Sequence, residues 1–361
     1  MRNNLIRLLL AIYRCFQYRL CGRHKYGVMP AGVLCEVEGK GAAPDFGDVV
    51  HPCVRYIPDG FNGHTWWMVY TPYYKANAEL ENPILCYADG DSTTIPTRWK
   101  VFSQVQDQPK VGYNSDPTLL YDEGRLFVMW RENSTERCSQ YGADRATFCA
   151  EVLPNGFGLV PSALLSVVGL LEDTEVSPTF LRNPDGGYRA LAMHLRFSSR
   201  RIAELPPMLR KIATMFVALT DLLFGVGQQK SFGISQWISP SLFQPFELQR
   251  TVQFMGKNPL YRPWHMDFFE YENRIYAIVQ TNQSNADICL AYSEDGVQFK
   301  FYKKPLMTNA SSGKVGIYKP TGGVVEGVFF LYYTAQDKQN RALNRLYLSQ
   351  MNFNEMIKEL L

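Results

Sequence analysis

The feature of this sequence that most constrains its fold is one phrase that recurs five times after about residue 45. Each copy begins with a polar residue, usually followed by proline, and continues as an apolar strand. A turn of Gly, Asp or Asn follows, and then a second strand rich in aromatic residues. The copies begin at residues 51, 116, 177, 265 and 319. Turns of this composition between two such strands are typical of β-hairpins, so the chain is expected to repeat one antiparallel unit.

The repeat predicts an all-β fold, a five-bladed β-propeller spanning residues 45–350. Several copies continue into a third strand, as at 84–87 and 288–292. Units of three to four short antiparallel strands are typical of propeller blades. The chain has 361 residues, of which 46% are hydrophobic, so it can supply the core of such a ring.

Three segments fall outside the repeat. Residues 1–44 form a lead-in to the repeat, and the first 23 residues predict a basic amphipathic helix. We expect this helix to pack on the protein or on another subunit. A peripheral membrane contact is the alternative. Residues 197–228 lengthen the third copy and predict a helical insertion, expected to pack on the side of the propeller, with a lid or membrane contact as the alternative. Residues 351–361 predict a short C-terminal helix.

Charge and cysteine usage exclude several classes of partner. The 37 basic and 34 acidic side chains nearly balance, and no long Lys/Arg run occurs, so nucleic acid is not an expected partner. The eight cysteines form no CxxC pair and have no metal-ligand spacing to histidine, which favours free thiols and argues against structural zinc. No secretory cleavage site follows the N-terminal stretch, so we expect a cytoplasmic protein.

The first strand of each propeller blade lines the central channel, so the five leading residues are expected to converge near the axis. Glu175 and Asp267 lie two residues from two of them and keep to the same strand face, because side chains alternate with period two. Imidazoles and carboxylates brought this close have coupled protonation, as acid/base chemistry requires. The predicted ring consists of His51, Asp116, Ser177, His265 and Lys319.

Three short motifs resemble the five-bladed propeller glycoside hydrolases of family 43, the arabinanase and xylosidase group related to invertases and mannoside phosphorylases. They are Asp116-Pro117-Thr118, Glu175 in the third copy, and Trp264-His265-Met266-Asp267. The resemblance covers about residues 45–350. It implies a hydrolase that cleaves a glycosidic bond of a polysaccharide or oligosaccharide with a pair of carboxyl groups.

The resemblance also implies roles for single residues. Asp116 matches the second-blade Asp that orients the general acid and adjusts its pKa, and Glu175 matches the third-blade general acid. Where that family places the Asp of its first Asp-Pro motif, the general base, this chain has His51-Pro52. Either His51 acts as the base, or Asp267 does, or the chain is not a standard hydrolase of this group.

The remaining candidates concern substrate and cofactor. Substrate-binding candidates are His265, Trp264, Trp130, Arg131, Tyr318 and Lys319; Trp66, Tyr73 and Tyr261 are further candidates for stacking on sugars, and Arg131 could bind an acidic sugar. No cofactor is expected, with a channel-bound divalent cation held by His51, His265, Asp116 or Asp267 as the alternative. Besides a glycosidase, a catalytically inactive carbohydrate-binding propeller and a scaffold remain open, because fold does not fix function.

Overall fold

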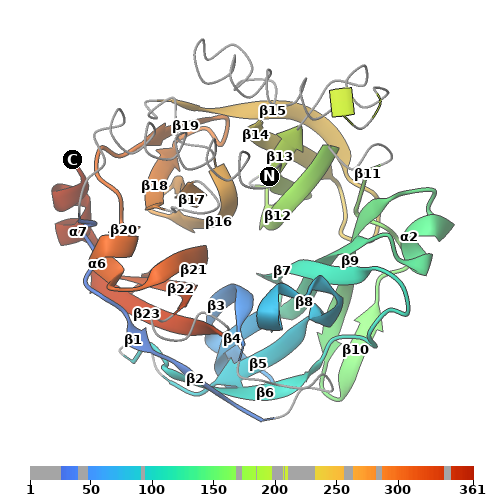
Figure 1. The fold of residues 1–361 in the computed structure, drawn as a ribbon, viewed down its shortest axis with the longest axis horizontal. Helices are drawn as coiled ribbons and strands as arrows, with labels where there is room; N and C mark the ends of the chain where they lie inside the picture. The colour runs from blue at the N-terminus through green and yellow to red at the C-terminus, as the bar shows by residue number, and fades with distance from the viewer. Residues whose placement is uncertain are drawn as a thin grey trace.

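The computed structural model describes residues 26–39, 48–90, 94–167, 173–183, 185–196, 206, 208–209, 232–255, 263–281, 287–336 and 343–361. Over these ranges the chain forms five antiparallel blades arranged around a central axis (Figure 1). The predicted all-β, five-bladed propeller is therefore confirmed. The predicted helix at residues 1–23 lies outside the described residues, as does all of the predicted insertion except residues 206, 208 and 209.

Each blade consists of consecutive strands, ordered from the axis outward. Blade 1 contains β3 (Val50–Phe61), β4 (His64–Thr71), β5 (Ile84–Ala88) and β6 (Arg98–Gln104), with β2 (Glu36–Glu38) parallel to β6. Blade 2 contains β7 (Tyr113–Asp122), β8 (Arg125–Asn133), β9 (Arg145–Leu153) and β10 (Gly156–Leu159), with β11 (Leu165–Val167) also on β9. Blade 3 contains β12 (Asp173–Arg182), β13 (Tyr188–Arg196), β14 (Phe232–Ser239) and β15 (Glu247–Met255).

Blade 4 contains β16 (Pro263–Tyr271), β17 (Arg274–Thr281), β18 (Asp287–Ser293) and β19 (Gln298–Phe301), with β20 (Met307–Thr308) on β18. Blade 5 contains β21 (Val315–Val325), β22 (Val328–Gln336) and β23 (Asn344–Asn352), and its outer strand is β1 (Val33–Leu34). The described helices are short: η1 (Tyr74–Ala76), η2 (Ala78–Leu80), α2 (Glu136–Gln140), α6 (Asn309–Ser312) and α7 (Phe353–Leu360). α7 lies where the sequence predicts a C-terminal helix. Within the described residues no helix is long and apolar enough to cross a membrane.

The hairpins between the first two strands of each blade form at the predicted turns. In the β3–β4 turn, Asn62 and Gly63 have φ of 48° and 81°; in the β7–β8 turn, Glu123 and Gly124 have φ of 48° and 77°. Two consecutive residues with positive φ are typical of the type I′ turn, whose twist matches that of the strands it joins.

The core lies between the blades, because both faces of each inner hairpin are buried. Trp66 packs with residues of blade 5 and its neighbour Trp67 with residues of blade 2. In blade 2, Leu119 likewise packs with residues of blade 1, and its neighbour Leu120 with residues of blade 3. This explains the aromatic and β-branched runs in the repeat, since a strand buried on both faces needs apolar residues at every position. Six of the eight cysteines lie in the described part of the chain, and all six are buried free thiols.

The ring is closed by strands from the two ends of the described chain. β1 pairs with β23, so the outermost strand of the last blade comes from before the first blade. Asp48 reinforces this closure, since its carboxylate accepts hydrogen bonds from the backbone amides of Tyr73 (2.6 Å) and Asn344 (2.7 Å).

The innermost strands are interrupted at the leading residue of each repeat. The pairing register shifts across this residue in blades 1, 2, 3 and 5, and just before it, between Pro263 and His265, in blade 4. Four of the leading residues have a positive φ: 54° at His51, 48° at Asp116, 49° at Ser177 and 38° at Lys319. Each of the four precedes a proline, which cannot donate to the neighbouring strand. These β-bulges redirect one side chain per blade, as bulges near functional sites commonly do.

Candidate active site

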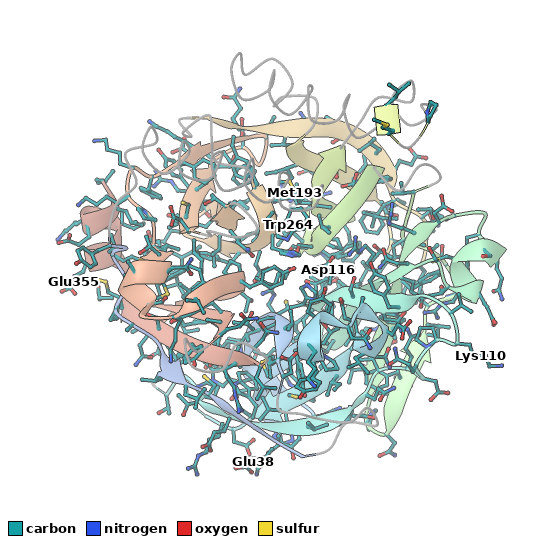
Figure 2. The ribbon with its side chains drawn as sticks, viewed as in Figure 1. Glu38, Lys110, Asp116, Met193, Trp264 and Glu355 are labelled. Carbon is teal, nitrogen blue, oxygen red and sulfur yellow. The ribbon has the colours of Figure 1, made fainter. Side chains whose placement is uncertain are left out.

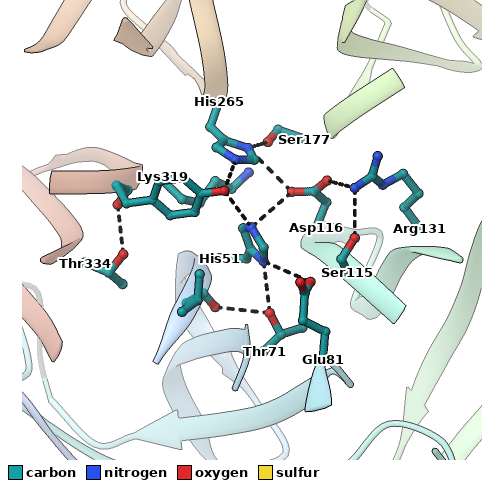
Figure 3. A network of polar contacts seen from close by, with 12 residues as sticks. His51, Thr71, Glu81, Ser115, Asp116, Arg131, Ser177, His265, Lys319 and Thr334 are labelled. Atoms are coloured by element: carbon teal, nitrogen blue, oxygen red, sulfur yellow. Dashed lines mark hydrogen bonds and ion pairs between the residues drawn. The ribbon is translucent and has the colours of Figure 1, made fainter. Parts of the chain in front are cut away.

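The predicted ring of leading residues forms one polar cluster at the channel axis (Figure 3). All five side chains come from the innermost strands of the five blades, at a bulge or directly after one, and all are buried. In the wider view Asp116 and Trp264 lie near the axis, whereas Glu38, Lys110 and Glu355 lie at the rim (Figure 2).

Asp116 stands between the two histidines. Its Oδ1 lies 3.7 Å from His51 Nε2 and 3.5 Å from His265 Nδ1, and its Oδ2 lies 2.8 Å from Arg131 Nη2. Oδ1 is buried and accepts no hydrogen bond from the described part of the chain. Two imidazole nitrogens therefore face one carboxylate oxygen at distances longer than a good hydrogen bond.

Tyr318 and Ser177 hold the imidazoles from the other sides. The Tyr318 hydroxyl lies 2.6 Å from His265 Nε2 and 3.4 Å from His51 Nε2. Ser177 Oγ lies 2.5 Å from His265 Nδ1. Trp264 packs edge-on against His265, with ring centroids 5.8 Å apart. These contacts fix both rings, so the cluster is preorganised.

The second strand of each of four blades supplies a polar side chain that supports the ring. Thr71 Oγ1 lies 3.0 Å from His51 Nδ1, and Arg131 binds Asp116. Gln280 Oε1 accepts a hydrogen bond from the Lys319 backbone amide (2.8 Å), and Thr334 donates to the Tyr318 carbonyl oxygen (3.0 Å). Two of these contacts thus hold the His51 and Asp116 side chains, and the other two satisfy backbone groups beside the bulge of blade 5.

Glu81 is a further acidic group beside this cluster, at the connection between β4 and β5. Its Oε2 lies 3.5 Å from His51 Nδ1, and its side chain is 5% exposed. Asn114 holds this connection in place: its backbone amide donates to the Glu81 carbonyl oxygen (3.2 Å), and its side chain donates to Asn82 Oδ1 (2.7 Å). Sequence reasoning missed Glu81 because it lies outside the repeated phrase. The order of the strands could have indicated it. In an antiparallel blade the second strand ends beside the start of the first, so the connection between the second and third strands lies near the leading residue.

Burial and neighbouring charges set the protonation of the cluster. Burial lowers the pKa of His51 to about 4, against the opposing effect of Asp116, and lowers that of His265 well below its usual range. Burial alone would raise the pKa of Asp116, but Arg131 and the imidazoles hold it below its usual range. Burial, followed by the charge of Asp116, raises the pKa of Glu81 well above normal. At neutral pH the imidazoles are therefore neutral and Asp116 is ionised, while the environment of Glu81 favours its protonated form more than that of an ordinary carboxyl group.

His51, Asp116 and His265 form a group that could hold a metal ion. One ligand atom from each lies within 4.8 Å of the other two. The donor set fits a divalent transition metal, because two neutral imidazoles and an ionised carboxylate are the protonation states that bind one. Two ligands bonded at about 2.1 Å in tetrahedral geometry lie about 3.4 Å apart. The separations between Asp116 and the histidines, 3.5 and 3.7 Å, are close to that value.

Glu175, the predicted general acid, lies outside the histidine cluster. It is buried on β12 and accepts a hydrogen bond from Ser235. It lines a small cavity that also includes Arg131, the partner of Asp116. Glu175 and Asp116 are thus both close to one guanidinium, and the role of general acid stays a prediction.

Asp267, one of the two predicted bases, lies one layer further along the channel. Arg55 donates to its two carboxylate oxygens at 2.8 and 2.9 Å, and Thr321 donates to Oδ2 at 2.5 Å. Burial would raise its pKa, but Arg55 and these hydrogen bonds hold it below the usual range. This saturated ion pair favours a structural role over that of a base that takes up a proton.

The substrate-binding candidates divide into channel and core residues. His265, Tyr318, Arg131 and Lys319 belong to the cluster; the Lys319 ammonium donates to the Met266 carbonyl oxygen (3.3 Å). Trp130 does not line the channel: it is fully buried with core residues of blades 1 and 2, and its indole N–H donates to Glu132 (3.0 Å). Trp66 is likewise core. Tyr73 is half-buried near Glu81, and Tyr261 lies outside the described residues.

Comparison with known proteins identifies the fold. No family model and no curated protein sequence matches the chain. An N-acetylgalactosamine deacetylase from F. plautii, solved with blood group B trisaccharide, matches with a TM-score of 0.68 and 15% identity, over 94% of this chain and 98% of that one. A solved β-xylosidase, RS223, matches with a TM-score of 0.58 and 13% identity, over 84% and 92% of the two chains.

Family 43 glycoside hydrolases recur among the solved structures with this fold. An exo-1,5-α-L-arabinanase from a bovine ruminal metagenomic library matches with a TM-score of 0.54 and 10% identity, over 87% of this chain and 96% of that one. A thermostable family 43 glycoside hydrolase also matches at a TM-score of 0.54, with 11% identity, over 85% and 92% of the two chains. The chain therefore has the propeller fold of the family 43 glycoside hydrolases, as its motifs suggested, and that fold is shared by the deacetylase.

Proposed function

We propose that the protein is a carbohydrate-active hydrolase that removes an acyl group from an acylated sugar, with His51, Asp116 and His265 holding a divalent metal ion. The observation that carries this proposal is the convergence of these three side chains, with their ligand atoms within 4.8 Å of one another. Two imidazoles and one carboxylate occupy three coordination positions and leave others open to water and substrate. The fold shared with an N-acetylgalactosamine deacetylase suggests an N-acetyl sugar as the first substrate to test.

The ligand nitrogen of His51 is held in the form that metal binding requires. The Thr71 hydroxyl can donate its proton to the Val50 carbonyl oxygen (3.5 Å), which lets it accept from His51 Nδ1. This arrangement favours the tautomer in which His51 Nε2 carries the lone pair and faces Asp116. A divalent ion bound here would polarise a carbonyl oxygen and lower the pKa of a bound water.

Glu81 is the candidate proton donor of the site, and Tyr318 helps to orient the imidazoles. Burial and the nearby Asp116 raise the pKa of Glu81 well above its usual range, which favours the protonated carboxyl group. It can give that proton to the nitrogen that leaves when an amide is hydrolysed, which is general acid catalysis. Burial also raises the pKa of Tyr318, so its hydroxyl stays protonated; its oxygen can accept from His265 Nε2 (2.6 Å), which would leave the lone pair of His265 on Nδ1, the nitrogen that faces Asp116. Arg131 keeps Asp116 ionised and oriented.

A second candidate is cleavage of a glycosidic bond, favoured by the position of Glu175. This buried carboxyl group borders the same guanidinium that binds Asp116, and it matches the general acid of the family 43 pattern. In that mechanism Asp116 orients the acid and His51 stands in the position of the base. The number of glycosidases that share the fold supports testing this bond in the same assay.

The deciding experiment separates the two bonds by their products. Metal-free protein, with and without added Zn²⁺ or Mn²⁺, is incubated with N-acetylated and non-acetylated oligosaccharides, and both released acetate and new reducing ends are measured. We expect metal-dependent acetate release that falls at least a hundredfold in Asp116→Asn and His265→Gln. His64→Gln is the matched control, because His64 lies at the turn between β3 and β4, at the opposite end of β3 from His51, and pairs with Asp89.

The alternatives give different products. New reducing ends that disappear in Glu175→Gln would establish the glycosidase instead. Binding of the glycans with neither product would favour a carbohydrate-binding module without catalysis.

A further inference from the structure

The hydrogen bonds around His51 run in one direction, because they end on a group that can only accept. That group is the Val50 carbonyl oxygen, which lies 3.5 Å from Thr71 Oγ1. Thr71 donates its proton there and accepts from His51 Nδ1, 3.0 Å away. A neutral imidazole carries one proton, so His51 Nε2 is left with a lone pair. The Tyr318 hydroxyl, 3.4 Å from that nitrogen, is the donor beside it.

The same direction continues through Tyr318 to His265, as the contacts in Figure 3 show. While the Tyr318 proton points to His51, the Tyr318 oxygen accepts from His265 Nε2 at 2.6 Å. His265 Nδ1 therefore carries no proton, and its 2.5 Å contact with Ser177 Oγ is a hydrogen bond that Ser177 donates. One acceptor at the end of the chain of contacts thus fixes the tautomers of both imidazoles.

The surroundings of Asp116 agree with this direction. Its buried Oδ1 lies 3.7 Å from His51 Nε2 and 3.5 Å from His265 Nδ1, and it accepts no hydrogen bond from the residues that the structure describes. A ring N–H aimed at an ionised carboxylate oxygen would approach to about 2.7–2.9 Å. Both imidazoles instead turn a lone pair towards Asp116, an arrangement that a metal ion completes.

Ser177 therefore occupies the nitrogen through which His265 would bind a metal ion. One lone pair accepts a hydrogen bond or binds a metal ion, so these two uses of Nδ1 exclude each other. The Ser177 side chain is buried, and Pro178 follows it in the bulge, which restricts the backbone there. Rotation of the hydroxyl about the Cα–Cβ bond is the motion that frees Nδ1.

We propose that Ser177 sets the metal affinity of the site, because its hydroxyl holds His265 Nδ1 in the metal-free protein and must give it up when a metal ion binds. This inference rests on the proposed function, since it concerns the same three ligands. Removal of the hydroxyl takes away a hydrogen bond that exists only in the metal-free protein. It also takes away a buried hydroxyl that has lost this partner in the metal-bound protein. Both effects favour metal binding.

The test compares the Zn²⁺ dissociation constants of metal-free wild type, Ser177→Ala and the control Ser349→Ala, measured by competition with a chelating indicator. Ser349 is a buried serine of β23 whose hydroxyl donates to the Pro30 carbonyl oxygen (2.7 Å), so its variant also loses one hydrogen bond. We expect Ser177→Ala to bind Zn²⁺ about threefold to tenfold more tightly than wild type, the effect of one hydrogen bond. Ser349→Ala should match wild type.

A second measurement needs no metal ion. The ¹⁵N chemical shifts of the imidazole nitrogens in metal-free wild type report which nitrogen carries the proton, and the spectrum of His265→Gln assigns the signals. We expect a proton on His265 Nε2 and none on Nδ1.

The outcomes separate this inference from the proposed function. Equal or weaker Zn²⁺ binding by Ser177→Ala overturns the inference, and weaker binding would make Ser177 a support or a ligand of the metal ion. A proton on His265 Nδ1 in the metal-free protein overturns it as well. In each of these cases Zn²⁺ binding by wild type leaves the proposed function standing. Failure of wild type to bind either Zn²⁺ or Mn²⁺ overturns the proposed function, and the inference with it.

Discussion

At the scale of single residues, His51 gives the site a different chemistry from that of a carboxylate pair. It stands at the leading position of blade 1, where the family 43 pattern has an Asp, and its Nε2 faces Asp116. A neutral imidazole next to an ionised carboxylate cannot act as the pair of carboxyl groups that cleaves a glycosidic bond, but the two are suitable ligands for a metal ion. The identity of this one side chain therefore bears on which class of hydrolysis the site supports.

The buried state of His51 predicts how stability changes with pH in the metal-free protein. Its pKa falls from 6.5 in the unfolded chain to about 4 in the folded one, so folding favours the neutral form. The contribution is complete above pH 6.5 and is lost as the pH falls towards 4. Relative to His51→Gln, the wild type should lose about 3 kcal/mol of unfolding free energy across that range. Urea denaturation at half-unit pH steps measures this; parallel curves for the two proteins would mean that His51 is not buried neutral.

At the scale of the element, the bulge before each proline is what aims a side chain at the axis. Ser177 has a φ of 49°, a conformation that costs an ordinary residue about 1–2 kcal/mol. Ser177→Gly should therefore be more stable than Ser177→Ala by about 1 kcal/mol, because both lose the contact with His265 and only alanine keeps the Cβ.

Ser235 on β14 provides the control for this comparison. It is not among the residues with positive φ, so glycine there should be less stable than alanine by about 0.5–1 kcal/mol. Chemical denaturation of the four variants measures both differences. If alanine is more stable than glycine at both positions, the backbone at Ser177 is not left-handed.

The parts of the fold that could be predicted from the sequence are those marked by the repeat. The hairpin turns and the leading residues could be located because glycine, asparagine and proline mark them at fixed places in every copy. Glu81 and Thr71 could not, since they lie outside the phrase and reach His51 only after the blade has folded. Trp130 was misplaced because strands buried on both faces are aromatic-rich throughout, and composition does not separate core from channel.

At the scale of the whole molecule, one buried ion pair joins four of the five blades. Asp267 of blade 4 binds Arg55 of blade 1, and it accepts hydrogen bonds from Thr179 of blade 3 (3.3 Å) and Thr321 of blade 5 (2.5 Å). The partners are up to 212 residues apart, so no local pattern predicts the contact. The pair lies next to the histidine cluster and fixes the blades that carry that cluster.

Breaking this pair should destabilise the ring. Arg55→Met leaves Asp267 buried without its cation and should cost about 3–5 kcal/mol of unfolding free energy. Arg182→Met, which removes an exposed pair with Asp122, should cost no more than about 1 kcal/mol. Equilibrium denaturation compares the two. If Asp267 is instead the general base, Asp267→Asn will abolish turnover at unchanged stability, which is the outcome that would reverse this assignment.

The bulges before proline also have a consequence for how such a protein can change. Each one directs whatever side chain it carries towards a common centre, while the proline and the apolar strand behind it remain the same. A histidine, an aspartate, a serine or a lysine occupies this place in different blades of one chain. A single substitution at one of these positions would therefore change the functional group presented at the axis, while the blades that hold it stay the same.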